Sequence, residues 1–217
     1  MSLKKYKTVL IGEVFAAEYE INKSRFIAHV KQVETEDEAK EFLLTIKKKH
    51  YDATHNCSAW VLGVDGSKQK SNDDGEPGGT AGNPILESIK KNELVNVIVV
   101  VTRYFGGIKL GAGGLIRAYS HTASLGLSAS NIVTMTPMQC LKITVNYNLL
   151  ASVENWIRNK KIRLENTDYA DNVTLNLLLL PEEVKDKLTE LTDLTSANFE
   201  HTLEEEILIA MPQEKEN

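Results

Sequence analysis

The sequence predicts an α+β fold in two domains, because strand-like and helix-like segments occur in mixed order and the pattern begins again after residue 137. The segment Val95 to Val101 is almost wholly apolar and β-branched, which is typical of a strand covered on both faces. Nine of the thirteen glycines lie between Gly75 and Gly114, in two runs on either side of this segment. We therefore expect a first domain over residues 1–134, a second over residues 138–211 and a frayed tail at residues 212–217.

The first elements are predicted from periodicity and from helix capping. Strand-like runs cover Lys7 to Ala17 and Lys23 to Val33, and the second run has one polar, basic face. A helix is expected from Thr35 to His50, because Thr35 and Glu38 form a capping box and lysines occupy the last turn. The acidic start and the basic end both suit the helix dipole.

In the middle of the first domain, we expect the central strand to lie between the two glycine runs. This strand then leads through Arg103 and Tyr104 into the second run. In chain order we expect a strand at Asn56 to Gly63, turns at Asp65 to Asp74, a helix from near Asn83 to before Leu94, the central strand at Val95 to Val101, and a helix from near Ala112 to about Ser130.

The second domain begins after Thr134 to Pro137, a segment whose composition predicts a short linker. The elements after it follow the order βαββαβ, which predicts a ferredoxin-like split βαβ domain. They are a strand at Leu141 to Tyr147, a helix at Leu149 to Lys160, a hairpin of Arg163 to Tyr169 and Asn172 to Leu180, a helix at Pro181 to Thr195 and a strand at His201 to Ala210.

Composition restricts the class of protein. The chain has 217 residues, of which 42% are hydrophobic and 25% charged, as in an ordinary globular protein. No apolar run approaches the ~20 residues that span a bilayer, so we expect a cytoplasmic protein without a membrane partner. Residues 1–135 carry 17 basic and 15 acidic side chains, whereas residues 136–217 carry 8 and 15. A polyanionic partner should therefore prefer the first domain.

The second glycine run predicts an anion-binding site. Gly111, Gly113 and Gly114 open a helix, where free amide groups and the positive end of the dipole favour an anion. Neither the dinucleotide-binding pattern nor the Walker A pattern is present, and a tight turn with a close helix–strand contact is the alternative interpretation. The candidate anion- or RNA-binding residues are Lys23, Arg25, Arg103, Lys109, Gly111, Gly113, Gly114, Arg117 and His121.

The first glycine run contains an acidic loop of Asp73, Asp74 and Glu76. These carboxylates could hold a divalent cation, neutralise Arg103 or Lys109, or form a solvated turn. The spacing does not match an EF-hand, and we expect neither a bound metal nor a cofactor.

His55 and Cys57 would share one face of a strand, but neighbouring apolar residues favour a buried, inert cysteine over a nucleophile. With Cys140 far away in the sequence, no disulfide framework or zinc site is predicted.

Four motifs together closely resemble the IMPACT family, particularly its bacterial YigZ-type members. They are KSRFIAHV (23–30), DATHNCSAWVLG (52–63), SNDDGEPGGTAGNPI (71–85) and VVTRYFGGIKLGAGGLIRAYS (100–120). The resemblance implies an N-terminal domain similar to domain IV of elongation factor G and a small C-terminal domain similar to its domain V. It also implies a role in the regulation of translation, because eukaryotic members restrain a starvation-responsive kinase. It assigns no active site.

The leading hypothesis is a non-enzymatic, translation-associated protein whose first domain binds RNA, the ribosome or a ribosome-linked partner. The alternative is a metal-assisted enzyme that acts on a phosphorylated or carboxylated metabolite in the same pocket. A protein–protein adaptor with an aromatic patch of Tyr104, Phe105 and Tyr119 is a third possibility. Sequence-specific DNA binding is not expected.

Overall fold

The structure is a computed structural model that describes residues 3–212. The chain folds into two compact units. The N-terminal unit contains residues 5–135 and 210–212, and the C-terminal unit contains residues 3–4 and 136–209. Both units combine sheets with helices, so the predicted α+β class is confirmed. Among the described residues, no helix has the length and apolar character of a membrane span.

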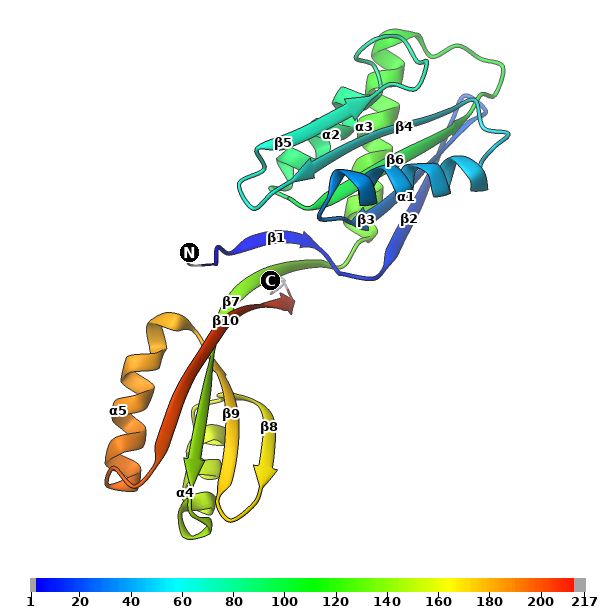
Figure 1. The fold of residues 1–217 in the computed structure, drawn as a ribbon. Coiled ribbons are helices and arrows are strands. Elements are labelled where there is room, and N and C mark those ends of the chain that lie inside the picture. The colour runs from blue at the N-terminus through cyan, green and yellow to red at the C-terminus, as the bar shows by residue number, and fades with distance from the viewer. Residues whose placement is uncertain (1–2, 213–217) are drawn as a thin grey trace. The chain divides into compact units, whose positions relative to one another are not determined.

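The N-terminal unit is built on a five-stranded antiparallel sheet with helices on both faces (Figure 1). Helix α1 packs on one face, and helices α2 and α3 pack on the other. The strand order is β2-β3-β6-β4-β5, with bounds β2 Val14–Ile21, β3 Ser24–Gln32, β4 His55–Leu62, β5 Lys68–Asn72 and β6 Val97–Tyr104. The helices are α1 Glu36–Lys49, α2 Gly82–Lys91 and α3 Gly111–Ala129.

Strand β6 separates two apolar layers of the N-terminal unit. Its odd-numbered valines are buried with side chains of α2 and α3, whereas Ile98 and Val100 are buried with side chains of α1. Successive side chains of a strand point to opposite faces, so a strand buried on both faces is apolar at nearly every position. The prediction for this strand is confirmed, and the strand continues to Tyr104, so that Arg103 lies within it.

Helix α1 begins at the predicted cap. The hydroxyl oxygen of Thr35 accepts a hydrogen bond from the amide of Glu38 at 3.2 Å, and the Glu38 carboxylate accepts one from the amide of Glu34 at 2.8 Å. Acidic residues fill the first turn and lysines fill the last. These contacts hold the helix that covers the β3–β6–β4 face.

Helix α3 packs closely against β3 because of Gly126. A Cβ atom on this residue would lie 2.7 Å from the Cβ of Ala28, which is closer than real side chains approach. The small residue therefore lets the helix backbone come near the sheet. The first turn of α3 follows the carboxyl end of β6 through the short segment 105–110 of the second glycine run.

The C-terminal unit has the predicted βαββαβ order. Its sheet order is β10-β7-β9-β8, which is the order of a ferredoxin-like fold. Apolar side chains of α4 and α5 pack on one face of this sheet, with Leu141, Leu175 and Leu177 fully buried. The elements are β7 Ile132–Val145, α4 Tyr147–Asn159, β8 Arg163–Tyr169, β9 Val173–Leu179, the 3₁₀ helix η1 Pro181–Glu183, α5 Val184–Thr195 and β10 Glu200–Pro212.

Three predictions about element bounds are wrong. The run from Lys7 to Ala17 is two strands, β1 Tyr6–Val9 and β2, separated by a turn at Gly12, and β1 pairs with β7 instead of the main sheet. The turn-rich segment contains strand β5, which owes its formation to pairing with β4. The expected linker at residues 134–137 lies inside β7, where Pro137 falls between the residues that pair with β1 and those that pair with β9.

His29 is the buried titratable residue between β3 and α1. The residue is 3% exposed, and its ring centroid lies 5.0 Å from that of His50 at the end of α1. Its Nε2 atom has no hydrogen-bond partner in the described part of the chain. Burial, reinforced by His50 and Lys49, lowers the pKa of His29 to about 4.

We expect the free energy of unfolding of the N-terminal unit to fall as the pH decreases. His29 takes up a proton only near pH 4 when folded but near pH 6.5 when unfolded, so acid favours the unfolded chain through this window. The full shift corresponds to about 3 kcal/mol. Urea unfolding at several pH values measures this free energy. It is followed by the fluorescence of Trp60 in a Trp156→Phe background, so that the signal comes from the N-terminal unit.

The His29→Gln variant should lose most of this pH dependence, whereas His121→Gln, on the exposed face of α3, should keep it. Equal slopes of unfolding free energy against pH in the wild type and His29→Gln would contradict the assignment.

Candidate functional site

The two glycine-rich runs meet at one pocket of the N-terminal unit. The pocket has a volume of about 400 Å³. The first run contributes Glu76 and Pro77, and the second contributes residues 109–112. The remaining lining residues are Thr54, His55, Arg103, Phe105 and Leu115. The structure thus brings the two runs, which are distant in sequence, together on one surface.

A buried ion pair of Glu76 and Arg103 lies at this pocket. The Arg103 Nη1 atom is 2.6 Å from Oε1 of Glu76, and the two side chains are 6% and 3% exposed. The Tyr119 hydroxyl donates to the same carboxylate oxygen at 2.7 Å. Of the three interpretations of the acidic loop, neutralisation of an arginine therefore describes Glu76. The charge of Arg103 is therefore largely neutralised by Glu76 within the protein.

Asp73 and Asp74 organise the loop between β5 and α2. Asp73 accepts hydrogen bonds from the amides of Gly79, Ala81 and Gly82, at 2.8, 3.0 and 2.8 Å. Burial acts to raise the pKa of Asp73, but these backbone hydrogen bonds outweigh it and the pKa is lowered. Asp74 accepts from the amide of Asn56 at 2.7 Å and pairs with Lys47 at 2.6 Å.

Each acidic residue of the loop thus has its own protein partners. Within residues 3–212, no group of three or more His, Cys, Asp or Glu side chains is arranged to hold a metal ion. The carboxylates shape the loop and cap α2, instead of converging on one point.

His55 is the pocket residue that the sequence interpretation left out of the site. Its Nδ1 atom lies 2.8 Å from the carbonyl oxygen of Asp74. A carbonyl only accepts, so Nδ1 carries a proton, and Nε2 is the ring atom that can accept one. This Nε2 atom is 3.9 Å from Oε2 of Glu76. The sequence did not indicate a role for His55 at the site, because the acidic loop that it contacts lies about 20 residues away in the chain.

Cys57 is buried, as expected for an inert residue. Its sulfur lies 3.0 Å from the carbonyl oxygen of Asp73 and 3.3 Å from the Tyr119 hydroxyl. Burial raises the pKa of the thiol to about 12, so the thiolate is disfavoured.

The first turn of α3 supplies amide donors to the pocket. Leu110 occupies the N-cap position, its apolar side chain cannot accept a hydrogen bond, and the first turn has no acidic residue. Gly111 has φ +67°, a left-handed conformation that favours glycine. Lys109 is exposed beside this turn and lines the pocket. This combination matches the chemistry of an anion site.

The glycines fall into two groups. Some are explained by the fold: a Cβ on Gly106 would lie 2.0 Å from the backbone of Lys23, and one on Gly82 would lie 2.7 Å from the backbone of Asn72. These support the close-contact interpretation. Gly78 has open space and an ordinary φ, so neither packing nor backbone conformation requires glycine there.

The other predicted basic residues lie outside the pocket lining. Arg25 forms a two-point contact with Glu18, at 2.7 and 2.9 Å. Lys23 is exposed in the β2–β3 turn, with φ +63°. His121 contacts the ring of Tyr19.

Arg117 is exposed, and its Nη1 atom lies 3.7 Å from the position of a Cβ on Gly113, so its guanidinium reaches back toward the start of α3. Gly113 and Gly114 form the rest of this turn.

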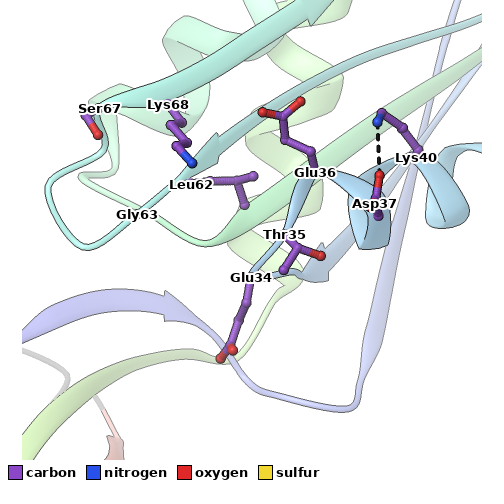
Figure 2. Close-up of a pocket in the computed structure, with 9 residues that line it drawn as sticks. All are labelled: Glu34, Thr35, Glu36, Asp37, Lys40, Leu62, Gly63, Ser67 and Lys68. Carbon is purple, nitrogen blue, oxygen red and sulfur yellow. Dashed lines mark hydrogen bonds and ion pairs between the residues drawn. The ribbon is translucent and has the colours of Figure 1, made fainter.

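A second pocket, of about 490 Å³, lies beside the start of α1 (Figure 2). Glu34, Glu36 and Asp37 line it from the segment that enters α1, and Ser67 and Lys68 line it from the β4–β5 side. The Asp37 carboxylate is paired with Lys40 at 3.0 Å. The acidic lining disfavours an anion, so this pocket is a poorer candidate.

Comparisons with known proteins match both units. The Impact N-terminal domain matches residues 22–127, and the Domain of unknown function DUF1949 matches residues 143–198. The chain is 47% identical to "IMPACT family member YvyE" of Bacillus subtilis (strain 168), over 83% of this chain and 84% of that protein. It is 34% identical to "IMPACT family member YigZ" of Escherichia coli (strain K12), over 83% and 90%. A solved structure titled "Crystal structure of an hypothetical protein" has a TM-score of 0.60 and 29% identity, covering 98% of this chain and 100% of that one.

We expect removal of either member of the Glu76–Arg103 pair to lower the free energy of unfolding by about 3–5 kcal/mol, because the other charge is left buried without a partner. Glu76→Gln and Arg103→Met test this in urea. The double variant should lose less free energy of unfolding than the sum of the losses in the two single variants. Additive losses would show that the pair is not energetically coupled.

Proposed function

We propose that this chain, which belongs to the IMPACT family, is a cytoplasmic, translation-associated protein that binds RNA phosphate, on the ribosome or on a ribosome-linked partner. The family resemblance of the glycine-rich motifs is confirmed by relatives that are similar over most of the chain. The observation that carries the proposal is the junction of an uncapped helix N-terminus with Lys109 in one pocket.

Three sources of positive potential favour an anion at this pocket. The amides of the first turn of α3 point out of the helix end, where the dipole is positive. Lys109 has no ion-pair partner among the described residues. Arg117 extends its guanidinium toward the same turn. The nearby carboxylate of Glu76 is already neutralised, so it does not oppose an anion.

The distribution of charge supports the N-terminal unit as the RNA-binding part. Basic side chains outnumber acidic ones up to residue 135, and acidic side chains outnumber basic ones afterwards. Phosphate contacts dominate nonspecific nucleic-acid affinity, so an acidic unit is disfavoured as the main contact surface.

The Lys109→Glu/Arg117→Glu variant should lose co-sedimentation with ribosomes at low salt. Wild-type binding should weaken as salt rises, because each neutralised phosphate releases counterions. Lys48→Glu/Lys91→Glu is the control, since it makes the same change in net charge at exposed positions on α1 and α2. Unchanged binding by the Lys109/Arg117 variant would sink this proposal.

A second candidate function is acid–base catalysis on a phosphorylated or carboxylated metabolite in the same pocket. The observation that favours it is His55, whose Nδ1–H donates to the Asp74 carbonyl and whose Nε2, the ring atom that can accept a proton, lies 3.9 Å from Oε2 of Glu76. Because Asp73 and Asp74 already bind amides and Lys47, we assign the base role to His55 instead of to a carboxylate-held metal.

For this enzyme function, a phosphorylated metabolite should raise the melting temperature and be consumed over time. His55→Gln should keep the thermal shift but lose turnover. Nucleotides and sugar phosphates, each with and without a divalent cation, form the ligand set. A flat thermal response across that set would count against the enzyme.

A further inference from the structure

We infer that the pocket accepts one unpaired nucleotide of an RNA strand, with its base against Phe105 and its phosphate at the start of α3. This inference rests on the proposed RNA function and names the part of RNA that the site takes. It uses a feature that phosphate binding does not need, namely the apolar wall of the same pocket.

The apolar wall consists of Phe105, Pro77, Leu110 and Leu115. Lys109 lines the same cavity, as do Gly111 and Ala112, which belong to the first turn of α3. Its volume of about 400 Å³ lies within the range of small-molecule sites. An apolar surface next to an anion site in a space of this size suits a ligand with a flat apolar part and an adjoining phosphate.

Phe105 is placed as a stacking surface. The residue is 45% exposed, although it directly follows the central strand β6. Its amide donates to the hydroxyl of Thr54 at 3.1 Å, and the guanidinium carbon of Arg103 lies 5.4 Å from the ring centroid. The ring is therefore held in position but remains open to solvent. Aromatic rings of this kind stack on the bases of single-stranded nucleic acids.

Arg103 gives independent support for a ligand in this pocket. Its side chain is 94% buried, since 6% is exposed, and it lines the cavity. One of its nitrogens binds Glu76, whereas its Nε atom has no acceptor in the part of the chain that the structure describes. This guanidinium therefore combines one donor that no described protein group accepts with an aromatic ring beside it, which suits an anion joined to a planar group.

These features select an unpaired nucleotide instead of a duplex. In a double helix, the bases are stacked on one another and expose only their edges in the grooves. A nucleotide that is splayed out of the strand presents a free base face and its phosphate together. Such a nucleotide can place its base against Phe105 and its phosphate at the first turn of α3 at the same time.

The test measures fluorescence anisotropy of labelled RNA with the full-length protein. The probes are a short single-stranded RNA, the same sequence as a duplex, and the same strand with abasic sites. Wild-type protein should bind the single strand about tenfold or more tightly than the duplex or the abasic strand, given the usual contribution of one stacked base.

Phe105→Ala should remove this preference and weaken single-strand binding about tenfold, and Phe105→Trp should restore it. Ile108→Ala is the matched control, because Ile108 is an exposed apolar residue of the same loop that does not line the pocket. Thermal unfolding of each variant verifies that it is folded.

Equal binding of all three probes, unaffected by Phe105→Ala, would overturn the nucleotide inference while Lys109- and Arg117-dependent binding could still stand. Absence of any RNA binding by the wild type would overturn the proposed function itself. Free nucleoside monophosphates provide a further arm. If they bind as tightly as the single strand, with the same dependence on Phe105, the ligand is a free nucleotide and the assignment to RNA is wrong.

Discussion

The buried ion pair of Glu76 and Arg103 is the interaction on which the rest of the site depends. It joins the first glycine run to the end of the central strand, and Tyr119 adds α3 to the same carboxylate. Separating the two charges would leave one of them buried without a partner, at a cost far above that of an exposed pair. The loop that forms one wall of the pocket is therefore held against β6 and α3.

The three acids of the loop divide the structural work between them. Asp73 caps the start of α2, Asp74 fastens the loop to β4 and α1, and Glu76 neutralises Arg103. Amides and cations of the protein thereby compensate the negative charge of these three side chains. The pocket that remains combines Lys109 with the open first turn of α3, so an acidic sequence surrounds a site suited to anions.

The glycines serve both the fold and the site. Gly106 and Gly126 allow backbone approaches that any side chain would block, and they bring the β2–β3 turn and the sheet close to the second run and α3. The close-contact interpretation and the anion-site interpretation therefore apply to different glycines. Close packing at these positions places Gly111 and Phe105 at the mouth of one pocket, where backbone amides and an aromatic ring can act together.

Sequence patterns alone predicted the α+β class, the capped helix α1, the central strand covered on both faces and the ferredoxin-like order of the C-terminal unit. These features follow from residues that are near one another in the chain, through periodicity and capping. Four features depend on contacts between distant parts of the chain: β5 forms, Pro137 lies within a strand, Glu76 pairs with Arg103, and His55 and Phe105 share a pocket with Lys109. Strand pairing and charge pairing join residues distant in sequence, and local patterns do not specify which distant partner a residue meets.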